Sequence, residues 1–151
     1  MPKNIVCDAS CLILLNKIER LDVLQKVFGK ILITDIIAQE IKISNPDWIK
    51  VQNPSSVLQK GLSNLLDAGE ASAISLAAEL ERALLIIDEA KGRKVATRMG
   101  IPITGTFGVI IAAKNKGHIS TVKPFLERIQ ATNFRISSHL VRKVLESANE
   151  N

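Results

Sequence analysis

Short, unbroken apolar runs that alternate with helical patterns are the feature that most constrains the fold of this chain. The clearest of the strands they predict are Asn4–Cys7, Lys30–Ile33 and Ala83–Ile87. A strand without polar alternation is buried on both faces, which is typical of a parallel sheet covered by helices. The pattern therefore predicts an α/β fold, a three-layer α/β/α sandwich with a central parallel sheet.

Helical periodicity fills the intervals between these strands and continues to the end of the chain. The expected helices span residues 10–18, 21–28, 35–43, 67–82, 90–99, 121–131 and 137–150, with one more in the stretch that ends at 66 and one that ends at 116–117. Short extended pieces are expected at 49–52 and 101–103. Thr34 is expected to cap the helix that follows it, and Gly117 suits the C′ position of the helix before it.

The composition predicts one globular domain over residues 1–151. Hydrophobic residues make up 46% of the chain and charged residues 23%, which excludes an intrinsically disordered protein. No run approaches the roughly 20 apolar residues that span a bilayer, and the N-terminus has no signal-peptide design. A cytoplasmic protein with no membrane partner is therefore expected. Cys7 and Cys11, in apolar surroundings, are expected to be buried thiols.

The net charge of +5 lies wholly in residues 76–151, because residues 1–75 carry equal numbers of acidic and basic side chains. Lys91, Lys94 and Arg98 are spaced i, i+3, i+7 on one expected helix, with Arg93 beside them. Such a stripe could track a nucleic-acid backbone, or it could be a solvated helix face. The charge is compatible with a nucleic-acid partner but is too small to be diagnostic.

Polar residues directly follow three of the expected extended segments. Asp8 follows the first strand, and Asp88 and Glu89 follow the strand that ends at 87. Thr104 and Thr106 flank a glycine just after the piece at 101–103. The carboxyl ends of neighbouring parallel strands meet at one edge, so these side chains would share a crevice. Alternatively, each aspartate only caps the following helix, and the threonines form an ordinary turn.

Three further acids lie on or beside expected helices. Glu40 falls on the apolar stripe of its helix with Ile37 and Ile41, where a charge is costly unless it is paired or bound to a metal. The alternative is a glutamate that snorkels at the edge of the stripe. Asp67 and Glu70 have capping-box spacing, yet Glu70 also begins an inward-facing stripe. Either acid, or both, could therefore face the crevice.

Carboxylates gathered in one crevice repel one another and raise one another's pKa, so such a cluster needs a cation. The candidate acids are Asp8, Glu40, Glu70 and Asp88. Carboxylate oxygens without His or Cys select Mg²⁺ or Mn²⁺, which can activate water and hold a phosphate ester. Residues 104–106, at the start of an expected helix, would add amide and hydroxyl donors suited to phosphate.

The motifs that carry a family resemblance run in order along nearly the whole chain. They are Ile5–Ser10, Ile37–Ile41, Leu66–Ala77, Leu84–Ala96, Gly100–Gly108 and Ala113–Gly117. In these motifs the chain resembles the PIN-domain family of nucleases, and most resembles a small prokaryotic subgroup akin to the toxin of VapBC toxin–antitoxin pairs. The resemblance implies a PIN fold, a homodimer and a Mg²⁺- or Mn²⁺-dependent ribonuclease with an RNA substrate. It also implies an antitoxin protein as a partner.

The resemblance also implies roles for individual residues. By motif match, the catalytic and metal-binding acids would be Asp8, Glu40, Glu70 and Asp88, with Ser10 and Thr104 as polar neighbours. The subgroup favours two aspartates where this chain has Asp88 and Glu89, which leaves open which of them faces the metal. The third acid is Glu70 rather than the aspartate common in PIN toxins, so its role could pass to Asp67. The basic residues Lys91, Arg93, Lys94 and Arg98, taken from their spacing and not from the resemblance, are the candidates for binding the RNA.

The leading hypothesis is therefore a metal-dependent endoribonuclease that forms no covalent intermediate. The first alternative is a catalytically inactive PIN-like module that binds RNA or a protein partner. The second is a small phosphotransferase with Asp8 as the nucleophile, although the chain lacks a second acid two residues after it.

Overall fold

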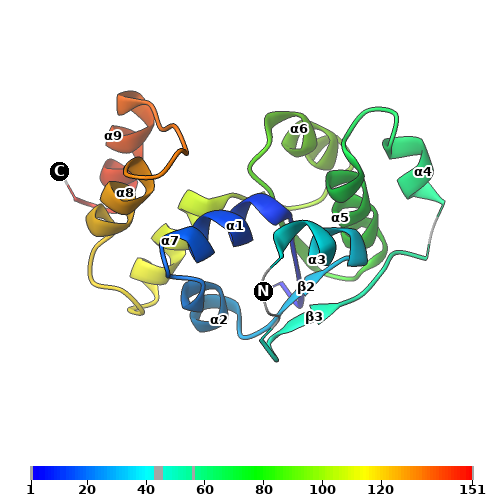
Figure 1. The fold of residues 1–151 in the computed structure, drawn as a ribbon, viewed down its shortest axis with the longest axis horizontal. Helices are drawn as coiled ribbons and strands as arrows, with labels where there is room; N and C mark the ends of the chain where they lie inside the picture. The colour runs from blue at the N-terminus through cyan, green and yellow to red at the C-terminus, as the bar shows by residue number, and fades with distance from the viewer. Residues whose placement is uncertain (1, 43–45, 56, 151) are drawn as a thin grey trace.

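Five parallel strands form one sheet at the centre of the computed structural model, which describes residues 2–42, 46–55 and 57–150. The strands are β1 (Asn4–Cys7), β2 (Ile31–Ile33), β3 (Ile49–Val51), β4 (Ala83–Ile86) and β5 (Ile103–Thr104). Their order across the sheet is β3-β2-β1-β4-β5, and every pairing is parallel. With the helices that surround it (Figure 1), this sheet confirms the predicted α/β/α sandwich.

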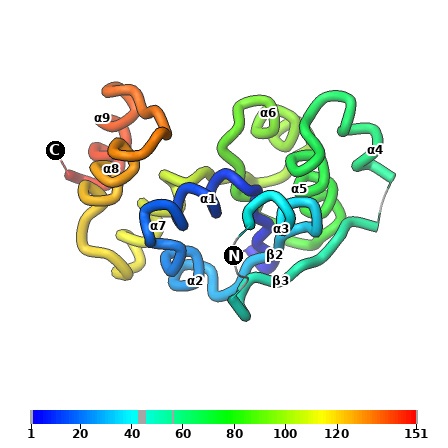
Figure 2. Tube along the Cα trace, viewed as in Figure 1, coloured from blue at the N-terminus to red at the C-terminus, as the bar shows by residue number. Residues whose placement is uncertain are grey.

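The helices of the described residues follow the expected pattern along the chain. They are α1 (Ala9–Lys17), α2 (Asp22–Phe28), α3 (Asp35–Ile41), α4 (Leu58–Leu62), α5 (Ala68–Glu79), α6 (Ala90–Arg98), α7 (Thr106–Asn115), α8 (Lys123–Gln130) and α9 (Ser138–Ser147). Figure 2 shows α8 and α9 at one end of the molecule and α3, α4 and α5 at the other. Within the described part of the chain, no helix is both long and apolar enough to cross a membrane.

Several helices are shorter than the periodicity predicts, and two of them end for a local backbone reason. The helices expected over 121–131 and 137–150 span only Lys123–Gln130 and Ser138–Ser147. The helix expected over 35–43 ends at Ile41, because Lys42 turns to a left-handed conformation with φ 50°. Residue 43 lies outside the described residues. The helix expected to reach 82 ends at Glu79, since Leu80 is extended and Arg82 has φ 48° as the chain enters β4. The stretch expected to be helical up to 66 contains only α4.

The three inner strands of the sheet, β2, β1 and β4, are largely buried on both faces, as the unbroken apolar runs predict, whereas the edge strands β3 and β5 are partly exposed. Val6 and Cys7 of β1 and Leu85 and Ile86 of β4 are fully buried. Cys11 is buried as well, so the prediction of two core thiols is confirmed. Each of these strands is sealed by helices; α5, for example, packs on both β1 and β4. Burial of this apolar surface is the main term that favours this fold.

The predicted helix caps are formed at the expected positions. The Thr34 hydroxyl accepts a hydrogen bond from the backbone N–H of Ile37 at 3.3 Å, which satisfies a free donor in the first turn of α3. Gly117 follows the C-cap of α7 with φ 80°, a conformation that a residue with a side chain rarely adopts.

The carboxylate of Glu150, near the C-terminus, forms hydrogen bonds that connect the end of the chain to α7 and to the start of α8. Glu150 accepts hydrogen bonds from the backbone N–H groups of Val122 and Lys123, at 2.7 and 3.2 Å, and from Lys114 Nζ at 2.9 Å. Val122 and Lys123 begin α8, and Lys114 lies on α7. A single side chain therefore joins α7, the start of α8 and the end of the described chain.

Replacing Glu150 with Ala is expected to lower the free energy of unfolding by about 1–3 kcal/mol, because three charge-assisted or N-terminal hydrogen bonds lose their acceptor. Urea unfolding followed by circular dichroism measures the change. Glu146→Ala is the matched control, since Glu146 is an exposed glutamate near the end of α9. Equal stability of the two variants would contradict this role.

Candidate functional site

The parallel pairing brings three strand ends to one edge of the sheet. The backbone N–H of Asp8, just past β1, donates to the carbonyl of Ile86 at 2.9 Å. Beyond β4, the N–H of Ile87 donates to the carbonyl of Thr104 at 2.8 Å. The strands β1, β4 and β5 are therefore neighbours in the sheet, as expected. The acids that follow β1 and β4 lie at the same edge.

A hollow of about 300 Å³ lies at this edge, and its polar lining is dominated by acids. The hollow is lined by Asp8, Ala9, Ser10, Glu40, Leu65, Leu66, Asp67, Glu70, Glu89 and Lys91. It therefore brings together three of the four acids expected from the sequence and both of the alternates. Asp88, Thr104 and Thr106 are not part of its lining.

Asp8 is the most deeply placed acid of the hollow, with only 4% of its surface exposed. The pKa of its carboxyl is raised to about 6, chiefly by burial and in addition by the charges of Asp67, Glu40 and Asp88, while a hydrogen bond from the backbone of Ala9 lowers it. Asp8 occupies the N-cap position of α1, but its side chain makes no capping hydrogen bond. The helix-cap interpretation of Asp8 is therefore wrong, and its carboxylate is left facing the other acids.

Asp67 and Glu70 form the predicted capping box and also line the hollow. The backbone N–H of Glu70 donates to Asp67 Oδ1 at 2.8 Å, and the N–H of Asp67 donates to Glu70 Oε1 at 3.4 Å. Glu70 is 6% exposed. Burial raises its pKa to about 7, and the charge of Asp67 adds to the shift. Asp67 and Glu70 therefore both cap α5 and border the hollow, so the predicted capping box does not exclude their predicted place at the site.

Glu40 differs from the expectation that it lies along the apolar stripe. The residue is exposed, while Ile37 and Ile41 on the same helix are buried, so it sits at the edge of the stripe. Its carboxylate reaches across to α5, where a Cβ at Gly69 would lie 2.5 Å from Oε1. Burial and the charge of Asp67 raise the pKa of Glu40. Because Gly69 has no side chain, the Glu40 carboxylate can approach α5 at this point. The sequence did not predict this contact.

Asp88 is held beside the hollow by the first residue of α7. Its Oδ1 accepts from the Thr106 N–H at 2.8 Å, and its Oδ2 accepts from the Thr106 hydroxyl at 2.6 Å. Asp88 therefore does not cap the helix that follows it, and the N-cap position of α6 falls to Glu89. The Thr106 hydroxyl, expected as a phosphate ligand, is used to orient Asp88. Asp88 still acts electrostatically on Asp8.

Gly105 provides the space in which Asp88 and an arginine come together. A Cβ at this position would lie 2.7 Å from Asp88 Oδ1 and 2.9 Å from Arg93 Nη1. Arg93 Nη1 also donates to the carbonyl of Ile87 at 2.8 Å, so the guanidinium is anchored to the end of β4. The backbone of Gly105 is extended (φ −119°), so the glycine is needed for space and not for its conformation.

Gly105→Ala is expected to lower the free energy of unfolding by about 1–3 kcal/mol, because the new methyl group must displace either the Asp88 carboxylate or the Arg93 guanidinium. Chemical denaturation measures this loss. Gly61→Ala serves as the control, since Gly61 lies in α4 with nothing within 4 Å of a Cβ. That substitution is expected to leave stability unchanged or slightly higher. A Gly105→Ala protein as stable as the wild type would refute the crowding argument.

The remaining basic and polar candidates are spread around the site. Lys91 lines the hollow, and Lys94 and Arg98 are exposed on α6. Ser10, in the first turn of α1, lines the hollow as well. Thr104 is only partly buried at the end of β5 and turns its hydroxyl towards Gly108 on α7. Of the expected basic residues, Lys91 therefore lines the acidic hollow and Arg93 lies beside Asp88, while Lys94 and Arg98 are exposed on α6.

The donor set of the hollow fits a divalent cation in its chemistry. Five carboxylates line one space, and none of the ion pairs formed within the described ranges involves them. The pKa values of Asp8 and Glu70 are raised chiefly by burial, and the charges of neighbouring acids act in the same direction. Among the described residues, no three His, Cys, Asp or Glu side chains already stand at metal-ligand spacing. Closing these acids around an ion therefore requires side-chain rotation.

A parallel α/β sandwich with acids at the carboxyl ends of its central strands defines a class of nuclease-type domains. Residues 4–150 match the family model DUF3368, which is described as a PIN domain. The chain belongs to the PIN-domain family, whose members are in general nucleases that use divalent metal ions. A comparison with curated proteins finds no match for the chain.

Proposed function

We propose that this protein is a metal-dependent endoribonuclease that hydrolyses RNA phosphodiesters with Mg²⁺ or Mn²⁺. The observation that carries the proposal is the hollow lined by five carboxylates, whose negative charge is not paired by a protein cation within the described residues. A cluster of this kind is stabilised by a hard divalent cation, since such ions prefer carboxylate oxygens. Membership in a family of nucleases supports the same reaction class.

The proposal gives each side chain a distinct task. Asp8, Glu40 and Glu70 would hold the cation, with Asp67 and Glu89 as further carboxylates of the same hollow. Asp88, fixed by Thr106, would add negative charge beside them. A divalent ion bound there would supply an activated water and neutralise charge on the phosphate.

The chain itself would position the substrate around these acids. Lys91 is the basic side chain in the lining of the hollow, so it would hold a phosphate oxygen against the acidic wall. The hydroxyl of Ser10 would donate a hydrogen bond to the same group. In-line attack by water would break the P–O3′ bond, leaving a 5′-phosphate on one fragment and a 3′-hydroxyl on the other.

Analysis of the product ends tests this proposal. Purified protein incubated with total cellular RNA and Mn²⁺ is expected to give fragments with 5′-phosphate and 3′-hydroxyl ends, and no fragments in EDTA. Cleavage that persists in EDTA, or fragments with 2′,3′-cyclic phosphates, would contradict it. Such ends come from attack by the ribose 2′-hydroxyl, which needs no metal-activated water.

A binding module without turnover is the second candidate. The commitment of both Asp88 oxygens to Thr106 and the absence of three acids at metal-ligand spacing in the described segments favour it. This candidate predicts salt-sensitive RNA binding through Lys91, Lys94 and Arg98, with no products at any metal concentration. The product-end analysis distinguishes the two candidates directly.

We also propose a toxin role within a toxin–antitoxin pair, a homodimeric state and a cytoplasmic location. The support for the first two is the resemblance to VapC-type toxins within the PIN-domain family. Co-purification of a second protein encoded beside this one, and sedimentation of the purified chain, would test the antitoxin and the dimer separately.

A further inference from the structure

The loop between α8 and α9 presents an exposed aromatic ring. The chain has four phenylalanines, one tryptophan and no tyrosine, and all five rings lie among the described residues. Phe134 is 37% exposed, whereas Phe125 is buried and the other three are half-buried. Phe134 is therefore the most exposed aromatic ring among the described residues, and its face is open to a flat ligand.

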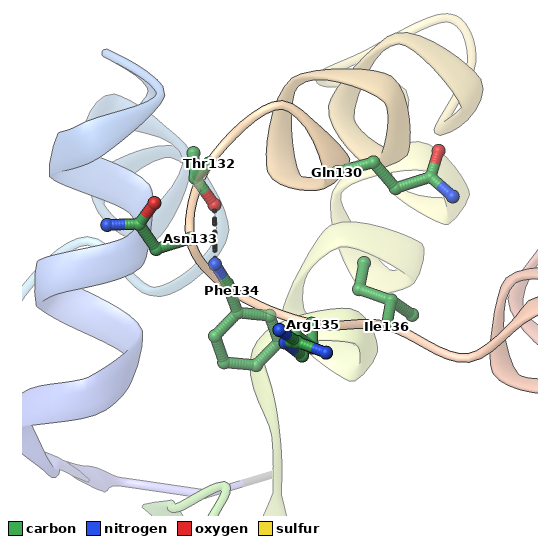
Figure 3. Close-up of a pocket in the computed structure, with 6 residues that line it drawn as sticks. All are labelled: Gln130, Thr132, Asn133, Phe134, Arg135 and Ile136. Carbon is green, nitrogen blue, oxygen red and sulfur yellow. Dashed lines mark hydrogen bonds between the residues drawn. The ribbon is translucent and has the colours of Figure 1, made fainter.

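The ring of Phe134 packs against a second ring of the fold, and the loop that carries it forms hydrogen bonds of its own. Phe134 packs edge-to-face against Phe107 of α7, with ring centroids 6.5 Å apart and an interplanar angle of 63°. Its backbone N–H donates to the Thr132 hydroxyl at 3.1 Å, and that hydroxyl donates to the carbonyl of Ile129 at 2.6 Å. Figure 3 shows the first of these bonds and the ring projecting from the loop. A ring restrained by such packing loses little entropy when a flat ligand stacks on it.

Two hollows flank this ring, and neither is lined by an acid. One is formed by residues of the loop itself, including Arg135. The other, of about 310 Å³, lies between the loop and α1 and includes Ile13 and Lys17. Phe134 lines both hollows, and the two cations give the surface a positive charge. This surface therefore suits a ligand that combines flat apolar faces with negative charge.

Ser10 connects this surface to the acidic hollow. It lines the hollow beside Phe134 and also the hollow that contains Asp8 and Glu70. The two spaces therefore meet at the first turn of α1. A polymer whose phosphate lies among the acids would pass Ser10 and reach the Phe134 ring.

We propose that Phe134 is a stacking platform for an unpaired base of the RNA strand, with Lys17 and Arg135 binding the phosphates beside that base. The proposal rests on the proposed function and adds a requirement, namely that the substrate be single-stranded on one side of the cleaved bond. Aromatic side chains stack all four bases, and adjacent cations follow the backbone, so the platform would bind without strong sequence preference.

Binding of two matched oligomers tests the platform. The probes are a short single-stranded RNA and an abasic oligomer of the same length, which has the phosphates but no bases. All proteins carry Asp8→Asn, so that the RNA stays intact. Phe134→Ala is expected to weaken binding of the RNA roughly 5- to 100-fold and to leave binding of the abasic oligomer unchanged. Val57→Ala, which truncates an 81% exposed apolar side chain elsewhere, is the control and should change neither.

Two further substitutions separate stacking from packing. Phe134→Leu keeps apolar contact with Phe107 but has no aromatic face, so it is expected to bind RNA as weakly as Phe134→Ala. Phe134→Trp should retain the affinity, and in a Trp48→Phe background its fluorescence should be quenched by the RNA and not by the abasic oligomer. Thermal unfolding of each variant shows whether a loss of RNA affinity is caused by disruption of the loop and not by loss of base stacking.

Three outcomes would overturn the platform. Wild-type affinity in Phe134→Leu would show that no base stacks there. Equal weakening for both oligomers would assign the effect to phosphate binding or to loop structure. A change in self-association without a change in RNA binding would assign the surface to a second copy of the chain. Failure of the parent protein to bind RNA would also refute the platform, whereas Mn²⁺ binding and RNA cleavage would still judge the proposed nuclease independently.

Discussion

Replacing Asp8 with Asn is expected to reduce Mn²⁺-dependent RNA cleavage by a factor of about 100 or more. Asp8 is the most deeply buried acid of the hollow, and the charges of three other acids act on it. Removal of its charge takes away the most deeply buried of the proposed metal ligands. Removing a residue that only hydrogen-bonds to a metal ligand typically reduces metal affinity or activity 10- to 100-fold. Loss of a ligand itself should therefore reduce activity by at least about 100-fold.

Initial cleavage rates at saturating Mn²⁺ measure this loss. Asp47→Asn is the matched control, because Asp47 is exposed and is not part of the hollow. The control should cleave at the wild-type rate, and both variants should have native circular dichroism spectra. Wild-type activity in Asp8→Asn would remove the acidic hollow from the mechanism.

The metal-free protein is expected to be more stable near pH 5 than at pH 8. The pKa of Asp8 is raised from 3.8 to about 6, and the pKa of Glu70 from 4.5 to about 7, chiefly by burial. An acid with a raised folded-state pKa binds its proton more tightly in the folded protein than in the unfolded chain. Its stabilising contribution is complete below the unfolded-state pKa and is lost as the pH rises through about 6 and 7. Ionisation of these acids therefore opposes folding at pH 8.

Neutral substitutions should reverse this loss. Asp8→Asn is expected to raise the free energy of unfolding of the metal-free protein at pH 8 by on the order of 2 kcal/mol, and Glu70→Gln should act in the same direction. At low pH, where the native acids are protonated, the gain should vanish. Urea denaturation in EDTA across this pH range measures the effect, with Asp47→Asn as the neutral control.

A divalent cation is expected to stabilise the wild type more than Asp8→Asn. Mn²⁺ should stabilise the wild type at pH 8, because binding to the folded state alone adds to the free energy of unfolding. It should stabilise Asp8→Asn much less. The ionised acids lower the stability of the metal-free protein. The bound ion would then explain why the site nevertheless contains them. Stability of the metal-free wild type that rises from pH 5 to pH 8 would contradict this account.

The features of the site that depend on strand ends and local spacing could be predicted from the sequence. Asp8 is placed by the apolar run before it, and the parallel sheet implied by such runs puts it near Asp88. The capping box of Asp67 and Glu70 depends only on residues three apart, so it too was predictable. Elements with unbroken apolar runs were likewise located to within one or two residues.

The features that depend on long-range contacts could not be predicted. Nothing within the helix that carries Glu40 reveals that its carboxylate reaches Gly69 on another helix. The hydrogen bonds between Asp88 and Thr106 join residues eighteen positions apart, so the spacing alone suggested a helix cap and a phosphate ligand instead. Phe134 lies in a loop without periodicity, and its exposure follows from how the α8–α9 loop packs on α7.

Calorimetric titration of Mn²⁺ into the purified protein at pH 8 tests the central claim, a shared carboxylate metal site, most directly. Saturable binding is expected for the wild type and for Asp47→Asn, and loss of binding is expected for Asp8→Asn and Glu70→Gln, both of which should remain folded. Binding that persists undiminished in Asp8→Asn, or a wild-type protein that binds no Mn²⁺ with or without RNA, would contradict the central claim.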